Sequence, residues 1–221
     1  MRNGPLVLVD YYSNKIRKLS IVKRIGTDYP ILIRKDVAKI LSKVSDKLPR
    51  NIFLQVDSGH RSREIQEKLW KIRKKQENSN SKVKGLVFNP FKGTPPHSTG
   101  GAVDVTLTDS KGREINLSEP FNKYYIEPRP KSRKVSKKAQ ELRMILRKLM
   151  LNEGFAPNPR EYWHFSYGDI AWAKYYKRKK LYNEIKVPKI MYYPIHKRII
   201  YRLFRIAFRI INNLLKIDTN Y

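Results

Sequence analysis

Two short stretches of this sequence contain side chains of the types that bind zinc and transfer protons. His97 and Asp104 lie on either side of a glycine pair, and His164 follows Glu161 by three residues in an aromatic run. A catalytic zinc ion takes three ligands from the protein and leaves a position for water, and a separate carboxylate accepts the proton of that water. We therefore predict a zinc site formed by His97, Asp104 and His164. Glu161 is left as the general base.

The glycine pair at positions 100 and 101 has a predicted role in forming this site. Glycine tolerates positive φ angles and close backbone approach, so the pair allows the loop of His97 to fold back over the strand that carries Asp104. One histidine and one aspartate are weak evidence for a metal site, because most such pairs are solvated or hydrogen-bonded. The second motif, with His164, supplies the missing ligand.

Glu161 can share a site with His164 only if the chain bends between them. Residues three apart on a regular strand point to opposite faces of the sheet. Pro157 and Pro159 precede this stretch and favour an irregular backbone. We therefore expect Glu161 to lie at a bend.

The apolar pattern predicts both strands and helices around these motifs. Strands are expected at 6–12, 52–57, 102–107 and 160–167. Helical spacing of apolar residues predicts three helices, one capped by Asp36 and ending before Pro49, one after residue 62, and one through 135–149. In the second helix the expected inward residues are Ile65, Leu69 and Ile72.

A turn at Asp109–Gly112 is expected to return residues 113–117 as a partner strand, which makes a hairpin at the centre of the chain. Strands and helices do not alternate strictly along the sequence. These features favour the α+β class, with a central, mainly antiparallel sheet and flanking helices.

Length and composition indicate the domain organisation of the chain, the metal ligands available to it and its cellular location. The chain has 221 residues, 40% of them hydrophobic, which suits one domain with an appendage. It contains no cysteine, so thiolate ligands and disulfides are excluded. The apolar run near the start is too short for a signal peptide, which predicts a cytoplasmic location.

The chain is strongly basic, with 48 lysine and arginine residues against 19 acidic ones and a formal net charge of +29. Such a charge suggests nucleic acid or an anionic surface as a partner. Lysine, isoleucine, asparagine and tyrosine are abundant along the whole sequence, however, and basic residues usually form a solvated face. We therefore do not expect direct binding of nucleic acid.

After Pro188 the sequence becomes a mostly apolar stretch with regularly spaced basic residues. We therefore predict a domain at 1–187 and a helical tail at 188–221. Polar residues, nearly all basic, recur every three or four positions in an otherwise apolar stretch: Arg198, Arg202, Arg205, Arg209, Asn212 and Lys216. Such a basic amphipathic helix either packs on the domain or on a second subunit, or lies on an anionic membrane surface as a peripheral anchor on its inner face.

Three stretches together resemble a known family. Pro96–Leu107, Glu161–Asp169 and Gly59–Ser62 are similar to motifs of the VanX-type D-alanyl-D-alanine dipeptidases, which are zinc peptidases acting on peptidoglycan precursors. The resemblance extends, with gaps, from about Val7 to Ile185. It implies one zinc ion per chain and hydrolysis of D-alanyl-D-alanine or a closely related D,D-dipeptide.

The resemblance also implies a role for each matching residue. His97, Asp104 and His164 would bind the zinc ion, and Glu161 would act as general base and then as general acid. Arg61 would stabilise the oxyanion of the tetrahedral intermediate.

The sequence departs from the family at three positions. His60 stands where the family usually has tyrosine, and Tyr162 where it usually has tryptophan. Asn122 replaces an aspartate that helps to hold the ammonium group of the substrate, so Asn122 can bind the substrate only as an uncharged partner. This change leaves a D,D-carboxypeptidase or another peptidoglycan peptidase as an alternative. An alternative of another class is a non-catalytic basic protein that binds membrane or nucleic acid.

Overall fold

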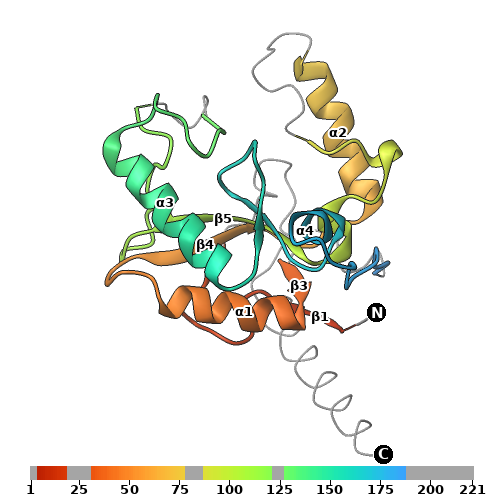
Figure 1. Cartoon of the computed structure of the whole chain (residues 1–221), viewed down its shortest axis with the longest axis horizontal. Coiled ribbons are helices and arrows are strands. Elements are labelled where there is room, and N and C mark those ends of the chain that lie inside the picture. Colours follow the sequence, from red (N-terminus) through yellow and green to blue (C-terminus); the bar gives the residue numbers. More distant parts are fainter. Residues whose placement is uncertain (1–3, 19–30, 78–86, 121–126, 188–221) are drawn as a thin grey trace, which may run out of the picture.

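Figure 1 shows the computed structural model of the chain, which describes residues 4–18, 31–77, 87–120 and 127–187. Its central element is a five-stranded sheet in the order β2-β4-β5-β7-β6. The strands are β2 (Arg17–Lys18), β4 (Phe53–Ser58), β5 (Ala102–Thr108), β6 (Ala156–Pro157) and β7 (His164–Ser166). The β2–β4 pair is parallel and the other three pairs are antiparallel. This confirms the predicted α+β class with a mainly antiparallel sheet.

A smaller sheet consists of β1 (Leu6–Leu8) paired antiparallel with β3 (Leu32–Arg34). Strand β1 is shorter than the predicted strand at 6–12. A turn closed by the hydrogen bond from Tyr11 N to Leu8 O, 2.9 Å long, ends it. Val9 nevertheless remains fully buried.

The helices are α1 (Lys35–Asp46), α2 (Arg63–Glu77), α3 (Lys137–Asn152) and α4 (Ile170–Tyr175), with 3₁₀ turns η3 (Pro90–Lys92) and η4 (Pro96–Thr99). Helices α1 and α3 contribute Leu41 and Leu146 to the main core, which also contains Val105 and Phe165 from the sheet. None of the helices in the part of the chain described here is long and apolar enough to cross a bilayer. The predicted tail helix at 188–221 lies outside the described residues.

Alternation along the strands separates the core from the polar face of the sheet. In β5, Val103 and Val105 belong to the main core, whereas Asp104 between them does not. In β7, Phe165 is in the core and its neighbour His164 is not. Successive side chains on a strand point to opposite faces. Asp104 and His164 therefore share the face of the sheet that is opposite to the core.

The prediction that Asp36 caps the first helix is wrong. Helix α1 begins at Lys35 with Arg34 in the N-cap position, and no side chain caps it. Asp36 lies within the first turn, where its carboxylate accepts a 3.4 Å hydrogen bond from the Tyr182 hydroxyl. Strand β3 leads directly into α1, so no turn residue separates the two elements.

The predicted inward face of the second helix is also wrong at Ile72, which is 47% exposed. Over residues 63–75 of α2, for which burial is described, Gln66 is buried, and its Nε2 donates a 3.0 Å hydrogen bond to Phe88 O. Trp70 packs edge-on against Phe91 of η3. Helix α2 thus rests on the segment around η3, and Figure 1 shows it projecting from the body of the molecule.

The turn of the predicted hairpin is present, but its returning strand is not. Gly112 has a φ of +80°, and its amide donates to Asp109 O at 3.0 Å. The returning chain makes one isolated bridge, between Thr108 and Glu114. It then turns toward α3, where Arg143 Nε donates to Leu117 O at 2.8 Å.

Candidate metal centre and active site

Three buried side chains converge on the polar face of the sheet. His97, Asp104 and His164 each offer one ligand atom, and these atoms all lie within 4.8 Å of one another. His97 Nε2 is 3.2 Å from His164 Nδ1 and 3.3 Å from Asp104 Oδ2, and His164 Nδ1 is 2.9 Å from Asp104 Oδ1. The three residues predicted to bind zinc are therefore in one place.

The sheet and the glycine pair bring these residues together. Asp104 and His164 are directly opposite each other in the β5–β7 register, so strand pairing alone places them side by side. His97 lies in η4, which ends at Gly100 with a φ of +72°. That left-handed residue returns the chain into β5. The predicted function of the glycine pair is confirmed at this position.

A backbone carbonyl fixes the orientation of the His97 ring. His97 Nδ1 lies 2.8 Å from Gly59 O and is the donor of that hydrogen bond, so Nε2 presents a lone pair to the cluster. A Cβ atom at Gly59 would lie 2.4 Å from Leu32 O, so only glycine fits here. The segment between β4 and α2 is thus part of the support of the metal centre.

The geometry of the cluster fits a zinc ion. Tetrahedral zinc with ligand bonds of ~2.0–2.2 Å places its ligand atoms ~3.3–3.6 Å apart. The distances from His97 Nε2 to His164 Nδ1 and Asp104 Oδ2, 3.2 and 3.3 Å, are close to that separation. Because His97 Nε2 carries a lone pair, a cation at the centre would satisfy it. Two nitrogens and a carboxylate oxygen are ligands that zinc prefers.

The protonation states of His97 and Asp104 also suit a cation. Burial and, to a smaller extent, the charge of Arg61 lower the pKa of His97 to about 4, against the opposing effect of Asp104. Burial would raise the pKa of Asp104, but the charges and hydrogen bonds of the two histidines hold it well below its usual range. Burial would lower the pKa of His164, but the hydrogen bond to Asp104 and the negative charges of Asp104 and Glu161 together outweigh burial and raise it. A metal ion that binds here would displace the His164 proton.

Glu161 lies at the predicted bend. Residues 162 and 163 form a turn between it and His164. Glu161 is buried, and Asn158 Nδ2 donates a 2.8 Å hydrogen bond to Glu161 Oε2. Burial, together with the negative charge of Asp104, raises the pKa of Glu161 to about 7, against the opposing charges of His164 and Arg61. The carboxylate is therefore near the cluster without being one of its members.

Arg61 approaches the cluster from the segment between β4 and α2. Its Nη2 lies 3.5 Å from Asp104 Oδ2, and its backbone amide donates to His97 O at 3.3 Å. Its Nε is buried and has no hydrogen-bond partner among the described residues. Burial lowers the pKa of Arg61, and the charges of Asp104 and Glu161 raise it in part. A buried guanidinium with an unused donor can meet negative charge that develops beside the metal centre.

The structure brings together five of the six predicted site residues, and the sixth, Asn122, lies outside the described residues. Sequence reasoning missed two supporting groups. These are Asn158, which holds Glu161, and the Gly59 carbonyl, which orients His97. Gly59 belongs to the Gly59–Ser62 motif, so its position gave a signal. Asn158 stands between two prolines and gave none.

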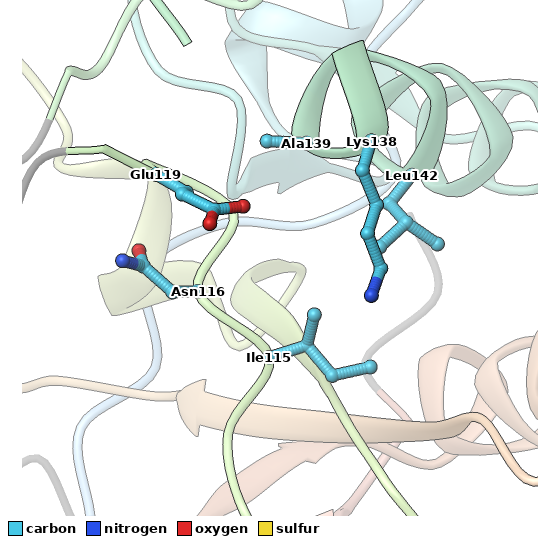
Figure 2. A pocket seen from close by; sticks show the side chains of 6 residues that line it. All are labelled: Ile115, Asn116, Glu119, Lys138, Ala139 and Leu142. Atoms are coloured by element: carbon cyan, nitrogen blue, oxygen red, sulfur yellow. The ribbon is translucent and has the colours of Figure 1, made fainter. Parts of the chain in front are cut away.

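A separate cavity of about 240 Å³ lies between the segment after the turn at Asp109 and the start of α3 (Figure 2). Its lining consists of Ile115, Asn116, Glu119, Lys138, Ala139 and Leu142. None of these is a candidate site residue. The cavity is therefore not the predicted active site.

Comparison with known proteins gives two curated relatives. The D-alanyl-D-alanine dipeptidase of Synechocystis sp. is 36% identical over 110 residues, which are 45% of this chain and 43% of that protein. The D-alanyl-D-alanine dipeptidase of Escherichia coli is 31% identical over 75 residues, 34% of this chain and 39% of that protein. The chain thus spans less than half the length of either relative.

Two solved structures are also similar. One is a variant of the vancomycin-resistance D,D-pentapeptidase VanY from the VanB-type cassette in complex with Zn(II). It is 20% identical, covers 67% of this chain and 80% of that chain, and has a TM-score of 0.44. The other is the vancomycin-resistance D,D-dipeptidase VanXYg in complex with a D-Ala-D-Ala phosphinate analogue. It is 22% identical, covers 75% of this chain and 56% of that chain, and has a TM-score of 0.41.

Most of the sequence also matches a family model. The family is described as D-ala-D-ala dipeptidase, and the match runs over residues 20–184, well over half of the chain. That range includes the three candidate metal ligands, Glu161 and Arg61. The chain therefore belongs to the D-ala-D-ala dipeptidase family.

Proposed function

We propose that this protein is a zinc metallopeptidase that hydrolyses D-alanyl-D-alanine or a closely related D,D-dipeptide. The observation that carries the proposal is the convergence of His97, Asp104 and His164, with ligand atoms within 4.8 Å of one another. The family description and the names of both curated relatives give the substrate class.

The proposed ligands are the three residues of the cluster, holding one zinc ion per chain. When bound there, zinc supplies a positive charge that polarises the substrate carbonyl and lowers the pKa of water toward ~7. The hydrogen bond from His97 Nδ1 to Gly59 O keeps that ring in the ligating orientation. Strand pairing keeps the other two ligands in register.

Glu161 is the proposed general base and acid. Its pKa near 7 lets it accept a proton from water and pass that proton to the leaving amine. The hydrogen bond from Asn158 leaves the second carboxylate oxygen of Glu161 available for this transfer. Arg61 is the proposed oxyanion donor, because its guanidinium lies against the cluster with a buried unpaired Nε.

One experiment tests the proposal. The purified chain is assayed for metal content and for release of D-alanine from D-alanyl-D-alanine, with and without a chelator, and L-alanyl-L-alanine serves as the control substrate. We expect one zinc ion per chain and chelator-sensitive release from the D,D-dipeptide alone. A folded sample that binds no zinc would exclude the proposal.

A second activity, D,D-carboxypeptidase, is favoured by Asn122, which stands where the family usually has aspartate. An uncharged amide binds a free ammonium group more weakly than a carboxylate does. Longer peptides that end in D-alanyl-D-alanine carry no ammonium at that point. Comparison of kcat/KM for the dipeptide and for such a peptide distinguishes the two activities.

A further inference from the structure

The extended segment Leu181–Val187, here called the strap, packs along the domain after α4 (Figure 1, blue). Its first two amides, from Leu181 and Tyr182, both donate to Gly168 O, at 2.7 and 2.9 Å. The Tyr182 ring is 1% exposed and belongs to the main core. The strap is therefore an integral part of the fold although it has no regular secondary structure.

The middle of the strap connects two segments of the site. Ile185 N donates to Ser98 O at 2.9 Å, and Ser98 directly follows the proposed ligand His97. His60 Nε2 lies 3.1 Å from Ile185 O, and His60 directly precedes Arg61. Burial lowers the pKa of His60 to about 4, so its ring is neutral and donates this hydrogen bond. One residue of the strap thus joins the loop of His97 to the segment of Arg61.

A bidentate ion pair fastens the strap next to this connection. Arg63 Nε is 3.2 Å from Glu184 Oε1, and Arg63 Nη2 is 2.7 Å from Glu184 Oε2. Paired charge-assisted hydrogen bonds of this kind fix geometry as well as adding energy. Arg63 is the first residue of α2, two positions after Arg61, and its Nη1 also donates to Pro90 O at 2.5 Å.

We propose that Glu184 is a positioning residue, which through Arg63 and the strap holds Arg61 at its place relative to His97. This inference rests on the proposed function. An oxyanion donor acts only when it is held at the position where negative charge develops, so a small displacement lowers the rate of the chemical step. Among the described residues, the hydrogen bonds of Glu184 go to Arg63 and not to a proposed ligand, so we expect zinc binding to be retained when Glu184 is replaced.

The test compares Glu184→Ala with a control that breaks another ion pair. Glu153→Ala removes the partner of Lys47, in a pair that joins the chain just after α1 to the chain just after α3. We expect about a tenfold lower kcat for Glu184→Ala, with KM and zinc content as in the wild type. Glu184→Gln keeps an acceptor for Arg63 and should recover most of the rate. The control should match the wild type in all three quantities.

A second variant, His60→Phe, removes the other connection between the strap and the Arg61 segment. Because both residues act through one element, the double variant should lose less rate than the product of the single losses. If Glu184→Ala fails to fold, Arg63→Lys takes its place in the cycle, because a lysine cannot form the bidentate pair with Glu184.

Two results would overturn the proposal. One is a kcat for Glu184→Ala equal to that of Glu153→Ala. The other is loss of zinc in parallel with rate, which would mean that Glu184 supports the ligands and not Arg61. Absence of zinc and of hydrolysis in the wild type would instead be a failure of the proposed function, so the two failures are distinguishable.

Discussion

Glu161 and His164 are three residues apart, yet the structure gives them different surroundings. Glu161→Gln keeps the size of the side chain and its contact with Asn158, and it changes none of the three ligand atoms. We expect this variant to bind zinc fully and to lose ~10²–10⁴-fold in kcat, the usual contribution of a general base. Metal analysis and D-alanine release, measured on the same sample, give both values.

The matched variant is His164→Ala, which removes one ligand atom and should lose both zinc and turnover. If Glu161→Gln lost zinc as readily as His164→Ala, the assignment of base and ligand would be wrong.

Arg61 gives a second test, because its charge and its geometry can be separated. Arg61→Lys keeps the positive charge but loses the planar fork of donors. We expect a fall in kcat of ~10²–10³-fold, as for the loss of an oxyanion donor, with zinc still bound. Arg113→Lys is the control, since Arg113 is 74% exposed and pairs with Asp109 on the surface. Equal kcat for both variants would exclude the proposed role of Arg61.

The residue types of the site could be predicted because zinc chemistry restricts them, and with cysteine absent only histidine and carboxylate ligands remain. The groups that orient them could not be predicted in the same way. The hydrogen bond between His97 and Gly59 joins residues 38 positions apart, and a backbone carbonyl leaves no signal in the sequence. Asn158 holds Glu161 only because the bend places it there.

The helices differ in how deeply their apolar side chains are buried, and therefore in how much each side chain contributes to stability. Leu146 of α3 is fully buried in the main core, whereas Ile72 of α2 is 47% exposed. We expect Leu146→Ala to lower the free energy of unfolding by ~2–5 kcal/mol and Ile72→Ala to change it by ~0.5 kcal/mol or less. Urea denaturation of both variants checks this. A loss at Ile72 as large as that at Leu146 would mean that α2 packs through this residue.

Apolar spacing identified the existence of α1, α2 and α3 but not always their packing. Ile65, Leu69 and Ile72 have the spacing of an inward face, yet α2 packs through Gln66 and Trp70 against η3 and the residues before it. The periodicity of one helix cannot show which neighbour it will meet. Alternation along β5 fixes which of its residues face the core, but it does not fix the partners of the strand. The returning strand predicted at 113–117 makes one isolated bridge, and β5 pairs with β4 and β7.

The position of the strap defines where the domain can end. A chain that stops at Lys180 would lack Tyr182, whose buried ring packs with Gly168 and Arg34. Removing a large buried aromatic side chain costs ~3–5 kcal/mol. The chain that stops at Lys180 would also lack Ile185 and its hydrogen bonds to Ser98 and His60. The predicted boundary at 187 keeps all of these contacts, so the chain 1–187 should fold and bind zinc.

The domain at 1–187 and the tail at 188–221 have separate predicted roles. We propose that the tail is a peripheral anchor on anionic membranes, because its basic residues recur along an apolar stretch. The chain 1–187 should keep wild-type activity on a soluble dipeptide, since every contact described for the site lies before residue 188. The same truncation should reduce co-sedimentation with anionic vesicles, and neutral vesicles serve as the control.

Binding of the full chain to anionic vesicles should also weaken as salt is added. Basic residues near a charged membrane contribute ~1 kcal/mol each, and salt screens this attraction. Equal co-sedimentation of the full chain and of 1–187 would exclude the anchor. An aggregated or inactive 1–187 chain would instead favour a tail that packs on the domain or on a second subunit, because its apolar side chains would then cover a surface that the truncation exposes.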